Sequence, residues 1–148
     1  MQVLAVTGPS DSGKTTTVAT LAARLRERGP VATVKHLTHA PDVDTEGKDT
    51  ARHRAAGART TIGITDDEGW FATGADLTLS DALDGLAPAH DYALVEGFSG
   101  SALPKLALGG SDPAGPVLAR AADHEAVDAA SVIEALEAAE PFVTLPAL

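Results

Sequence analysis

The sequence has no cysteine among its 148 residues, and only five of its side chains are Phe, Trp or Tyr. Without cysteine, disulfides, thiolate metal sites and cysteine nucleophiles are excluded. With so few aromatic residues, the core has to consist mainly of Val, Leu, Ile and Ala. No run of 18 or more apolar residues occurs, so the sequence predicts no membrane span. The first predicted strand starts at Gln2, which leaves no room for a signal peptide and favours a cytoplasmic location.

Positive charge is also scarce, and it is unevenly placed. The formal net charge is −10, yet residues 1–60 hold nine Lys or Arg against six Asp or Glu. Residues 61–148 hold two basic side chains against fifteen acidic ones. A basic first part suits an anionic ligand, and the acidic remainder argues against a nucleic-acid surface. The acidic surface is as consistent with adaptation to high salt as with ordinary solvation.

Strand-like and helix-like segments alternate, which favours an α/β fold with a mostly parallel sheet flanked by helices in a single domain, 1–148. A turn at 66–69 between two strands predicts a small β-hairpin. Asp49 and Ser80 are expected as N-caps of the second and third helices. The acidic end, 109–148, carries no recognised motif. The predicted strands cover 2–7, 31–36, 59–65, 70–73, 91–97, 104–110 and 117–120, and the predicted helices cover 14–28, 50–57, 79–86 and 128–139.

The stretch Gly-Pro-Ser-Asp-Ser-Gly-Lys-Thr at 8–15 fits the G-x-x-x-x-G-K-[ST] pattern of a phosphate-binding P-loop. The first glycine lets the strand turn sharply, and the second lets the backbone close around a phosphate because it has no Cβ. The following backbone N–H groups and the N-terminal dipole of the next helix attract an anion. Lys14 reaches the β- and γ-phosphates, and the Thr15 hydroxyl can ligate Mg²⁺. The predicted nucleotide-binding residues are Gly8, Asp11, Ser12, Gly13, Lys14 and Thr15.

A P-loop enzyme also needs an acid at the end of a neighbouring strand. Glu96 follows three apolar residues in ALVEG (93–97), and it can hold Mg²⁺ through water or orient an attacking water. We therefore predict Lys14 and Glu96 as the catalytic residues, with a solvated strand-end acid as the alternative for Glu96. Asp42 and Asp44, in the loop after the second strand, are further candidates for the magnesium shell, and Asp44 is preferred.

Other polar residues of the first half are less specific. His36 and His39, near the two aspartates, are only weak support for a transition-metal site. Lys35 and Lys48 suit a second anionic group near the first, with solvated lysines as the alternative.

Base preference is not readable from these residues, because no N-K-x-D or T-K-x-D stretch occurs. From the residues alone three classes stay open: a nucleotide-binding module with at most slow hydrolysis, a small-molecule kinase using ATP, and a structural domain with an idle loop. A kinase lid rich in arginine is not evident, since Arg120 is the only arginine after residue 59.

Four segments, taken together, resemble the MobB family of molybdopterin-guanine dinucleotide biosynthesis adapter proteins. They are GPSDSGKTT at 8–16, VKH at 34–36, DVDTEGKDTARHRAAGA at 42–58 and LVEGF at 94–98. The third is the most specific, because Asp-x-Asp, Gly-Lys-Asp-Thr, Arg and Ala-Gly-Ala follow one another at the family's spacing. PKLAL at 104–108 is similar to the family's next strand.

The resemblance implies a P-loop NTPase-like fold that binds GTP with Mg²⁺ and has weak GTPase activity at most. It also implies a homodimer that assists MobA, the guanylyltransferase that joins GMP to molybdopterin. By position, it implies that Gly13, Lys14, Thr15 and Thr16 hold phosphate and metal, and that Asp44 and Glu96 complete the metal and water shell.

A further hypothesis places the cationic segment around His36, Lys48 and Arg54 toward the pterin phosphate or the partner. No nucleic-acid or membrane partner is expected.

Overall fold

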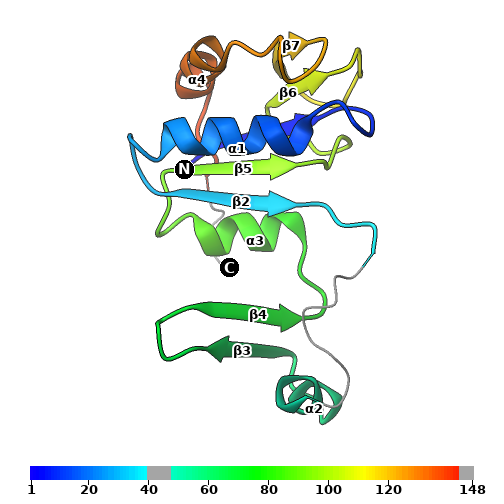
Figure 1. The fold of residues 1–148 in the computed structure, drawn as a ribbon, viewed down its shortest axis with the longest axis vertical. Helices are drawn as coiled ribbons and strands as arrows, with labels where there is room; N and C mark the ends of the chain where they lie inside the picture. The colour runs from blue at the N-terminus through cyan, green and yellow to red at the C-terminus, as the bar shows by residue number, and fades with distance from the viewer. Residues whose placement is uncertain (40–47, 144–148) are drawn as a thin grey trace. The chain divides into compact units, whose positions relative to one another are not determined.

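The computed structural model describes residues 1–39 and 48–143, and the chain divides into two compact units. The first unit comprises Met1–His36 and Ala82–Leu148, and the second comprises Leu37–Asp81. Each unit is described by itself (Figure 1). The single domain expected from the sequence stays a prediction.

The first unit is built on a five-stranded sheet with the order β2-β5-β1-β6-β7, in which every neighbouring pair is parallel. Helices α1 and α4 pack on this sheet (Figure 1). The predicted α/β class with a mostly parallel sheet is thus confirmed. Because the strands are parallel, their carboxyl ends meet at one edge, where ligands bind in open α/β sheets. The elements are β1 Gln2–Thr7, α1 Lys14–Leu25, β2 Val31–Lys35, β5 Tyr92–Glu96, β6 Lys105–Leu108, β7 Val117–Ala121 and α4 Ala129–Ala138.

The core of the first unit lies between the sheet and these two helices. Leu4 and Leu94 of the central strands are fully buried there and meet Leu25 of α1 and Ile133 of α4 in one apolar cluster. The opposite face of the central strands is buried as well, as Ala5 shows with 0% exposure. Strands buried on both faces read as continuous apolar runs, which is the pattern of QVLAVT and YALV.

The second unit contains a short helix and a two-stranded antiparallel sheet. Helix α2 spans Asp49–Ala55, and β3 (Thr60–Ile64) pairs with β4 (Trp70–Gly74). The hairpin predicted from the turn at 66–69 is confirmed. Helix α3, Leu79–Leu86, begins in this unit and ends in the first, where it buries Leu83.

Several predicted helix ends are wrong, including that of α2, which ends at Ala55 and not at residue 57. Helix α1 ends at Leu25 and not at residue 28, because the Arg28 N–H already turns back to the Leu25 carbonyl at 2.8 Å. Asp49 is the first residue of α2, and Lys48 stands at its N-cap without a side-chain hydrogen bond.

Helix α3 is capped by Thr78 and not by Ser80. The Thr78 Oγ1 accepts from the Asp81 N–H at 3.1 Å, and the Asp81 carboxylate accepts from the Thr78 N–H at 3.0 Å. Such a reciprocal cap needs residues three apart, a spacing that Thr78 and Asp81 satisfy. The strand boundaries differ from the predicted ones by two residues at most.

Candidate phosphate-binding site

The loop between β1 and α1 has the backbone conformation that its two glycines allow. Gly13 has φ 83° and stands at the N-cap of α1, in the left-handed region that disfavours a side chain. A Cβ atom at this position would lie 2.5 Å from the Cβ of His124, so the neighbouring loop leaves no room for one. Asp11, at the exposed part of the loop, also has a positive φ of 61°. The turn therefore depends on glycine at position 13 for both conformation and space.

Two buried hydroxyl groups brace the loop from within. Ser12 Oγ donates to the Pro9 carbonyl at 2.9 Å, and Thr17 Oγ1 donates to the Gly13 carbonyl at 2.9 Å. Ser12 and Thr17 are 8% and 2% exposed. The Ser12 hydroxyl is thus used inside the loop, whereas Thr16, in the first turn of α1, is exposed.

Lys14 arches back over the loop that precedes it. Its Nζ donates to the Gly8 carbonyl at 2.9 Å and to the Pro9 carbonyl at 2.6 Å. The ammonium therefore lies over the entrance of the loop, where it can be redirected to an anion.

Thr15 and Glu96, both predicted for a metal and water shell, lie in contact, and the role itself stays a prediction. The Thr15 hydroxyl lies 2.9 Å from Glu96 Oε1 and 3.0 Å from Oε2. Glu96 ends β5, directly beside β1, and only 11% of its side chain is exposed. A hydroxyl and a carboxylate suit Mg²⁺, which takes oxygen ligands and completes its shell with water and phosphate. These residues therefore fit such an ion.

Lys35 joins the same cluster from β2. The β2–β5 pairing sets Lys35 opposite Glu96, and the Lys35 Nζ lies 2.9 Å from Glu96 Oε1 and 3.3 Å from Thr15 Oγ1. The sequence assigned Lys35 only a general anion-binding role. The sequence does show that Lys35 and Glu96 each end a predicted strand. That the two strands are neighbours, however, follows only from the strand order of the sheet.

The roles predicted for the remaining residues also stay predictions. Asp42 and Asp44 lie outside the described residues, so their place in a metal shell stays a prediction. Lys48 and Arg54 belong to the second unit. Within residues 1–39 and 48–143 no cluster of three His, Cys, Asp or Glu side chains is arranged to hold a metal.

Three further features near the site had no clear sequence signal. The rings of His36 and Phe98 pair with centroids 4.6 Å apart, next to the carboxyl ends of β2 and β5. His124 packs against Gly13 from the loop after β7. Lys105 is fully buried in β6 and donates to the Ser101 and Leu103 carbonyls at 2.5 and 2.9 Å. Burial lowers the pKa of this Lys105 ammonium, which holds the turn between β5 and β6.

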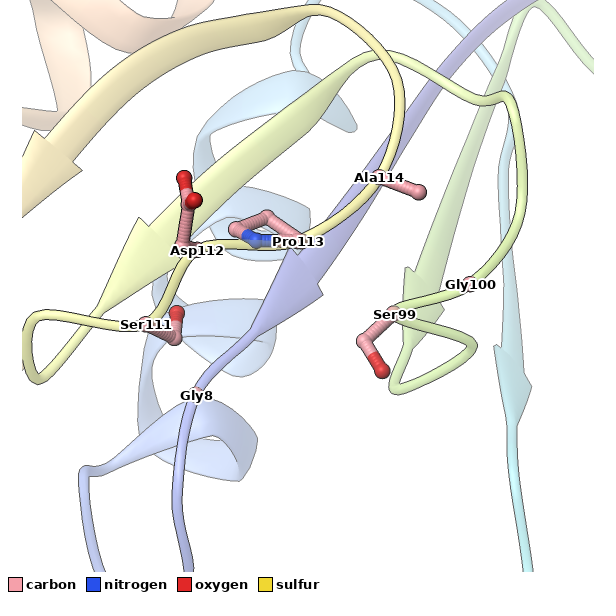
Figure 2. A pocket seen from close by; sticks show the side chains of 7 residues that line it. All are labelled: Gly8, Ser99, Gly100, Ser111, Asp112, Pro113 and Ala114. Atoms are coloured by element: carbon pink, nitrogen blue, oxygen red, sulfur yellow. The ribbon is translucent and has the colours of Figure 1, made fainter.

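That turn forms one wall of a cavity of about 370 Å³ beside the start of the P-loop. Figure 2 shows the turn after β5 on one side, the loop between β6 and β7 on the other, and Gly8 between them. The cavity is open and has no charged wall except at Asp112, which pairs with Arg120 at 3.1 Å. Its lining residues are Gly8, Ser99, Gly100, Ser111, Asp112, Pro113 and Ala114.

The parallel sheet, the glycine loop before α1 and the acid on the adjacent strand define a P-loop NTPase-like α/β protein. The family model described as "MobB: Molybdopterin guanine dinucleotide synthesis protein B" matches residues 3–130. The chain belongs to the MobB family, and the resemblance noted from its four sequence segments is confirmed.

Two curated relatives support the assignment. A Haloferax volcanii protein named "Probable molybdopterin synthase" is 38% identical over 148 residues, which is 100% of this chain and 51% of the relative. A Haemophilus influenzae "Molybdopterin-guanine dinucleotide biosynthesis adapter protein" is 38% identical over 112 residues, covering 72% of this chain and 62% of the relative. The chain thus spans between half and two thirds of the length of these relatives.

Solved structures are similar in fold. A MobB protein homolog from Bacillus stearothermophilus is 30% identical, with a TM-score of 0.54, over 72% of this chain and 63% of that one. Bacillus subtilis MobB gives a TM-score of 0.65 over 94% of this chain and 100% of that one, at 24% identity. At that identity the second likeness concerns the fold alone.

Proposed function

We propose that this protein is a GTP-binding adapter in molybdopterin-guanine dinucleotide biosynthesis and assists a MobA-like guanylyltransferase. Family membership and the name of the Haemophilus relative support the pathway. The observation that carries nucleotide binding is the contact between the Thr15 hydroxyl and Glu96, which brings the P-loop and the strand-end acid to one point. The kinase alternative gains no support, since the relatives described above are not named as kinases.

The roles of the site residues follow from their chemistry. The backbone from Gly8 to Thr16, with Asp11, Ser12 and Gly13 in the turn, surrounds the phosphates, and Lys14 exchanges the Gly8 and Pro9 carbonyls for phosphate oxygens. Thr15 and Glu96 hold Mg²⁺, directly or through water, with Asp44 as the further acid. The ion, when bound, neutralises charge on the terminal phosphates.

Slow hydrolysis is the most that this arrangement favours. The Glu96 carboxylate accepts the Thr15 hydroxyl and also pairs with the Lys35 ammonium. Both carboxylate oxygens are engaged by these contacts, and in the proposed complex they serve the Mg²⁺ ion, so neither is free to accept a proton from an attacking water. Binding, and not turnover, is therefore the proposed main activity.

The choice of GTP is tested by competition. A fluorescent GTP analogue is bound to the protein with Mg²⁺ and displaced by GTP or by ATP. We expect GTP to displace it at a lower concentration than ATP. A clear preference for ATP would reject the proposed nucleotide and revive the kinase alternative.

The adapter role is tested in a reconstituted reaction. A MobA-type guanylyltransferase, molybdopterin and GTP are mixed with or without this protein, and dinucleotide formation is measured. We expect wild type and Arg26→Ala to raise the yield and Lys14→Ala to leave it at the basal level. The Arg26 side chain is a matched control because it is exposed and lies outside the loop. No stimulation by wild type would contradict the adapter role.

The cationic segment is part of the proposal as a molybdopterin or partner contact. Lys48→Ala combined with Arg54→Ala is expected to weaken binding of molybdopterin or of the guanylyltransferase in a pull-down. Unchanged binding of both would remove these residues from the proposal.

A homodimer is proposed from the exposed apolar face of the hairpin. Ile62, Ile64 and Trp70 lie on one face of β3–β4 and are 60%, 77% and 71% exposed. Such a patch marks an interaction surface. Light scattering after gel filtration is expected to show a dimer for wild type and for the control Val143→Asp, whose side chain is exposed in the first unit, and a monomer for Ile64→Asp. A wild-type monomer would contradict the dimer.

A cytoplasmic location stays a prediction. Among the described residues, no helix has the length and apolar character that a membrane span needs.

A further inference from the structure

We propose that Lys35 makes binding of the divalent cation conditional on the nucleotide phosphates, because its ammonium holds the two groups that the cation needs. The inference rests on the proposed function, in which Thr15 and Glu96 hold Mg²⁺. It goes beyond that function by giving a lysine of β2, outside the P-loop, control over when the metal binds.

The first argument is geometric. The Thr15 hydroxyl gives its proton to Glu96, at 2.9 and 3.0 Å from the two carboxylate oxygens. Its oxygen then faces the Lys35 Nζ, from which it accepts at 3.3 Å. The same Nζ lies 2.9 Å from Glu96 Oε1. A hydroxyl that donates to an acid has only its two lone pairs left for a metal, and Lys35 takes one of them, so the ammonium and a metal ion compete for the Thr15 oxygen.

The second argument is electrostatic. A divalent cation at Thr15 and Glu96 has to approach a site where one positive charge already pairs with the carboxylate. Like charges at such a separation repel each other, and the repulsion is stronger where water is partly excluded. Glu96 has only 11% of its side chain exposed, so screening by solvent is reduced on its side. The free metal is therefore disfavoured while Lys35 stays in place.

The third argument concerns which partner can move. Half of the Lys35 side chain is exposed, and β2 is an edge strand of the sheet, so the ammonium can leave without opening the core. Glu96 ends the buried strand β5 and cannot follow it. Terminal phosphates on the P-loop offer Lys35 another anionic partner. The nucleotide and the cation then bind together, and Lys35 passes from the carboxylate to the phosphate.

A plain surface ion pair is the alternative, and it predicts a different result. Exposed ion pairs contribute little to stability. If Lys35 were only such a pair, its removal would change the unfolding midpoint slightly and leave the metal affinity unchanged. Metal binding without nucleotide therefore separates the two interpretations.

The experiment titrates Mn²⁺ alone into the full chain and follows the free ion by electron paramagnetic resonance. The first variant is Lys35→Met, which keeps a straight side chain one atom shorter and removes the charge. The second is Lys35→Arg, which keeps the charge. Arg26→Gln is the matched control, because it removes one exposed positive charge from the same unit away from the site. Glu96→Gln in the Lys35→Met background removes the carboxylate that the metal needs.

We expect Lys35→Met to bind Mn²⁺ about tenfold or more tightly than wild type, because one repulsive charge is gone. Lys35→Arg and Arg26→Gln should stay close to wild type, and Glu96→Gln should abolish the gain. Equal Mn²⁺ affinity of wild type and Lys35→Met would overturn the proposal. An equal gain in Arg26→Gln would also overturn it, because net charge alone would then account for the effect.

A titration of GTP with Mg²⁺ into the same preparations keeps the two proposals apart. Wild type that fails to bind nucleotide would reject the proposed function, while the Mn²⁺ result would still decide whether Lys35 opposes the metal. Nucleotide binding with unchanged Mn²⁺ affinity in Lys35→Met would reject only the inference about Lys35.

Discussion

The two units of the chain use their apolar residues in opposite ways. In the first unit, the central strands are buried on both faces, and Leu94 has 0% exposure. In the second unit, the hairpin buries Thr61 but leaves Ile64 and Trp70 more than two thirds exposed. The contrast indicates that the first unit is stabilised by its own core, whereas the apolar face of the hairpin is left uncovered, as the proposed dimer requires.

The position of the polar groups follows the same division. The site residues Lys14, Thr15, Lys35 and Glu96 all project from the ends of elements in the first unit. A catalytic or binding site needs groups held by rigid elements, which the parallel sheet supplies. The hairpin of the second unit instead presents an exposed apolar surface.

The largest expected difference between the units is in stability. Leu94→Ala should lower the free energy of unfolding by about 2–5 kcal/mol, because it leaves a cavity in the core. Ile64→Ala should change it by no more than about 0.5 kcal/mol in the monomer, because the side chain is exposed. Urea unfolding at low protein concentration measures both. A loss as large for Ile64→Ala as for Leu94→Ala would mean that the hairpin face is covered within the chain.

A glycine pair gives the next comparison. Gly13 and Gly57 both have positive φ, but a Cβ on Gly13 would collide with His124, whereas Gly57 has open space around it. Gly13→Ala should weaken nucleotide binding by at least about tenfold, since both strain and a collision distort the loop. Gly57→Ala should cost about 1–2 kcal/mol in stability from backbone strain alone and leave nucleotide affinity unchanged. Calorimetry of nucleotide binding, with thermal unfolding as control, would contradict this if the two variants bound alike.

The ion pair between Arg28 and Glu137 should make the stability of the first unit depend on acid. Hydrogen bonds from Arg28 and then from Tyr92 hold the pKa of Glu137 below its usual 4.5. A lowered folded pKa adds stability that is present above the usual value and is lost as the pH falls through the folded one. The stability difference between wild type and Glu137→Gln should therefore shrink as the pH is lowered below 4.5.

The ion pair chosen for comparison in the second unit joins Arg52 and Asp49. The Arg52 Nη1 lies 3.9 Å from the Asp49 Oδ1, and both side chains are largely exposed. Asp49→Asn should change the free energy of unfolding by less than about 1 kcal/mol, because such a pair contributes little. Unfolding midpoints of Glu137→Gln and Asp49→Asn are measured across the pH range, each relative to wild type. If the two midpoints changed equally with pH, the expected difference between the two ion pairs would be absent.

Helix caps give the smallest comparison. The Asp128 side chain accepts from the Ala130 N–H at 3.1 Å at the start of α4, whereas Lys48 caps α2 with no side-chain hydrogen bond. Asp128→Ala should lower the thermal unfolding midpoint by a few degrees, and Lys48→Ala should leave it in place. A differential scanning calorimeter resolves such shifts, and equal midpoints would mean that the Asp128 cap is replaced by water.

Much of the fold was predictable because local signals agreed with it. The apolar run before Gly8 and the Gly-Lys-Thr start of α1 leave few other structures for that segment. The hairpin followed from a glycine turn between two β-rich segments. The cap of α3 was missed because Ser80 and Thr78 are both good caps, and only the reciprocal bond with Asp81 distinguishes them.

Site residues that belong to one continuous sequence motif could be predicted. Those that come together only through the order of the strands in the sheet could not. Lys14 and Thr15 belong to a contiguous motif, and Glu96 has an apolar lead-in. Lys35 meets Glu96 only because β2 lies beside β5, and the two residues are 61 positions apart in the chain. The burial of Lys105 had no sequence signal, since a lysine at the start of a strand is ordinarily solvated.

The central claim is that the loop from Gly8 to Thr16 binds a nucleoside triphosphate through its backbone and Lys14. The most direct test is calorimetric titration of GTP with Mg²⁺ into wild type, Lys14→Ala and the control Arg26→Ala. We predict saturable binding by wild type and Arg26→Ala, and a loss of at least about tenfold in Lys14→Ala, whose ammonium no longer reaches the phosphates. Equal affinity in Lys14→Ala and wild type, or no binding by wild type, would contradict the claim.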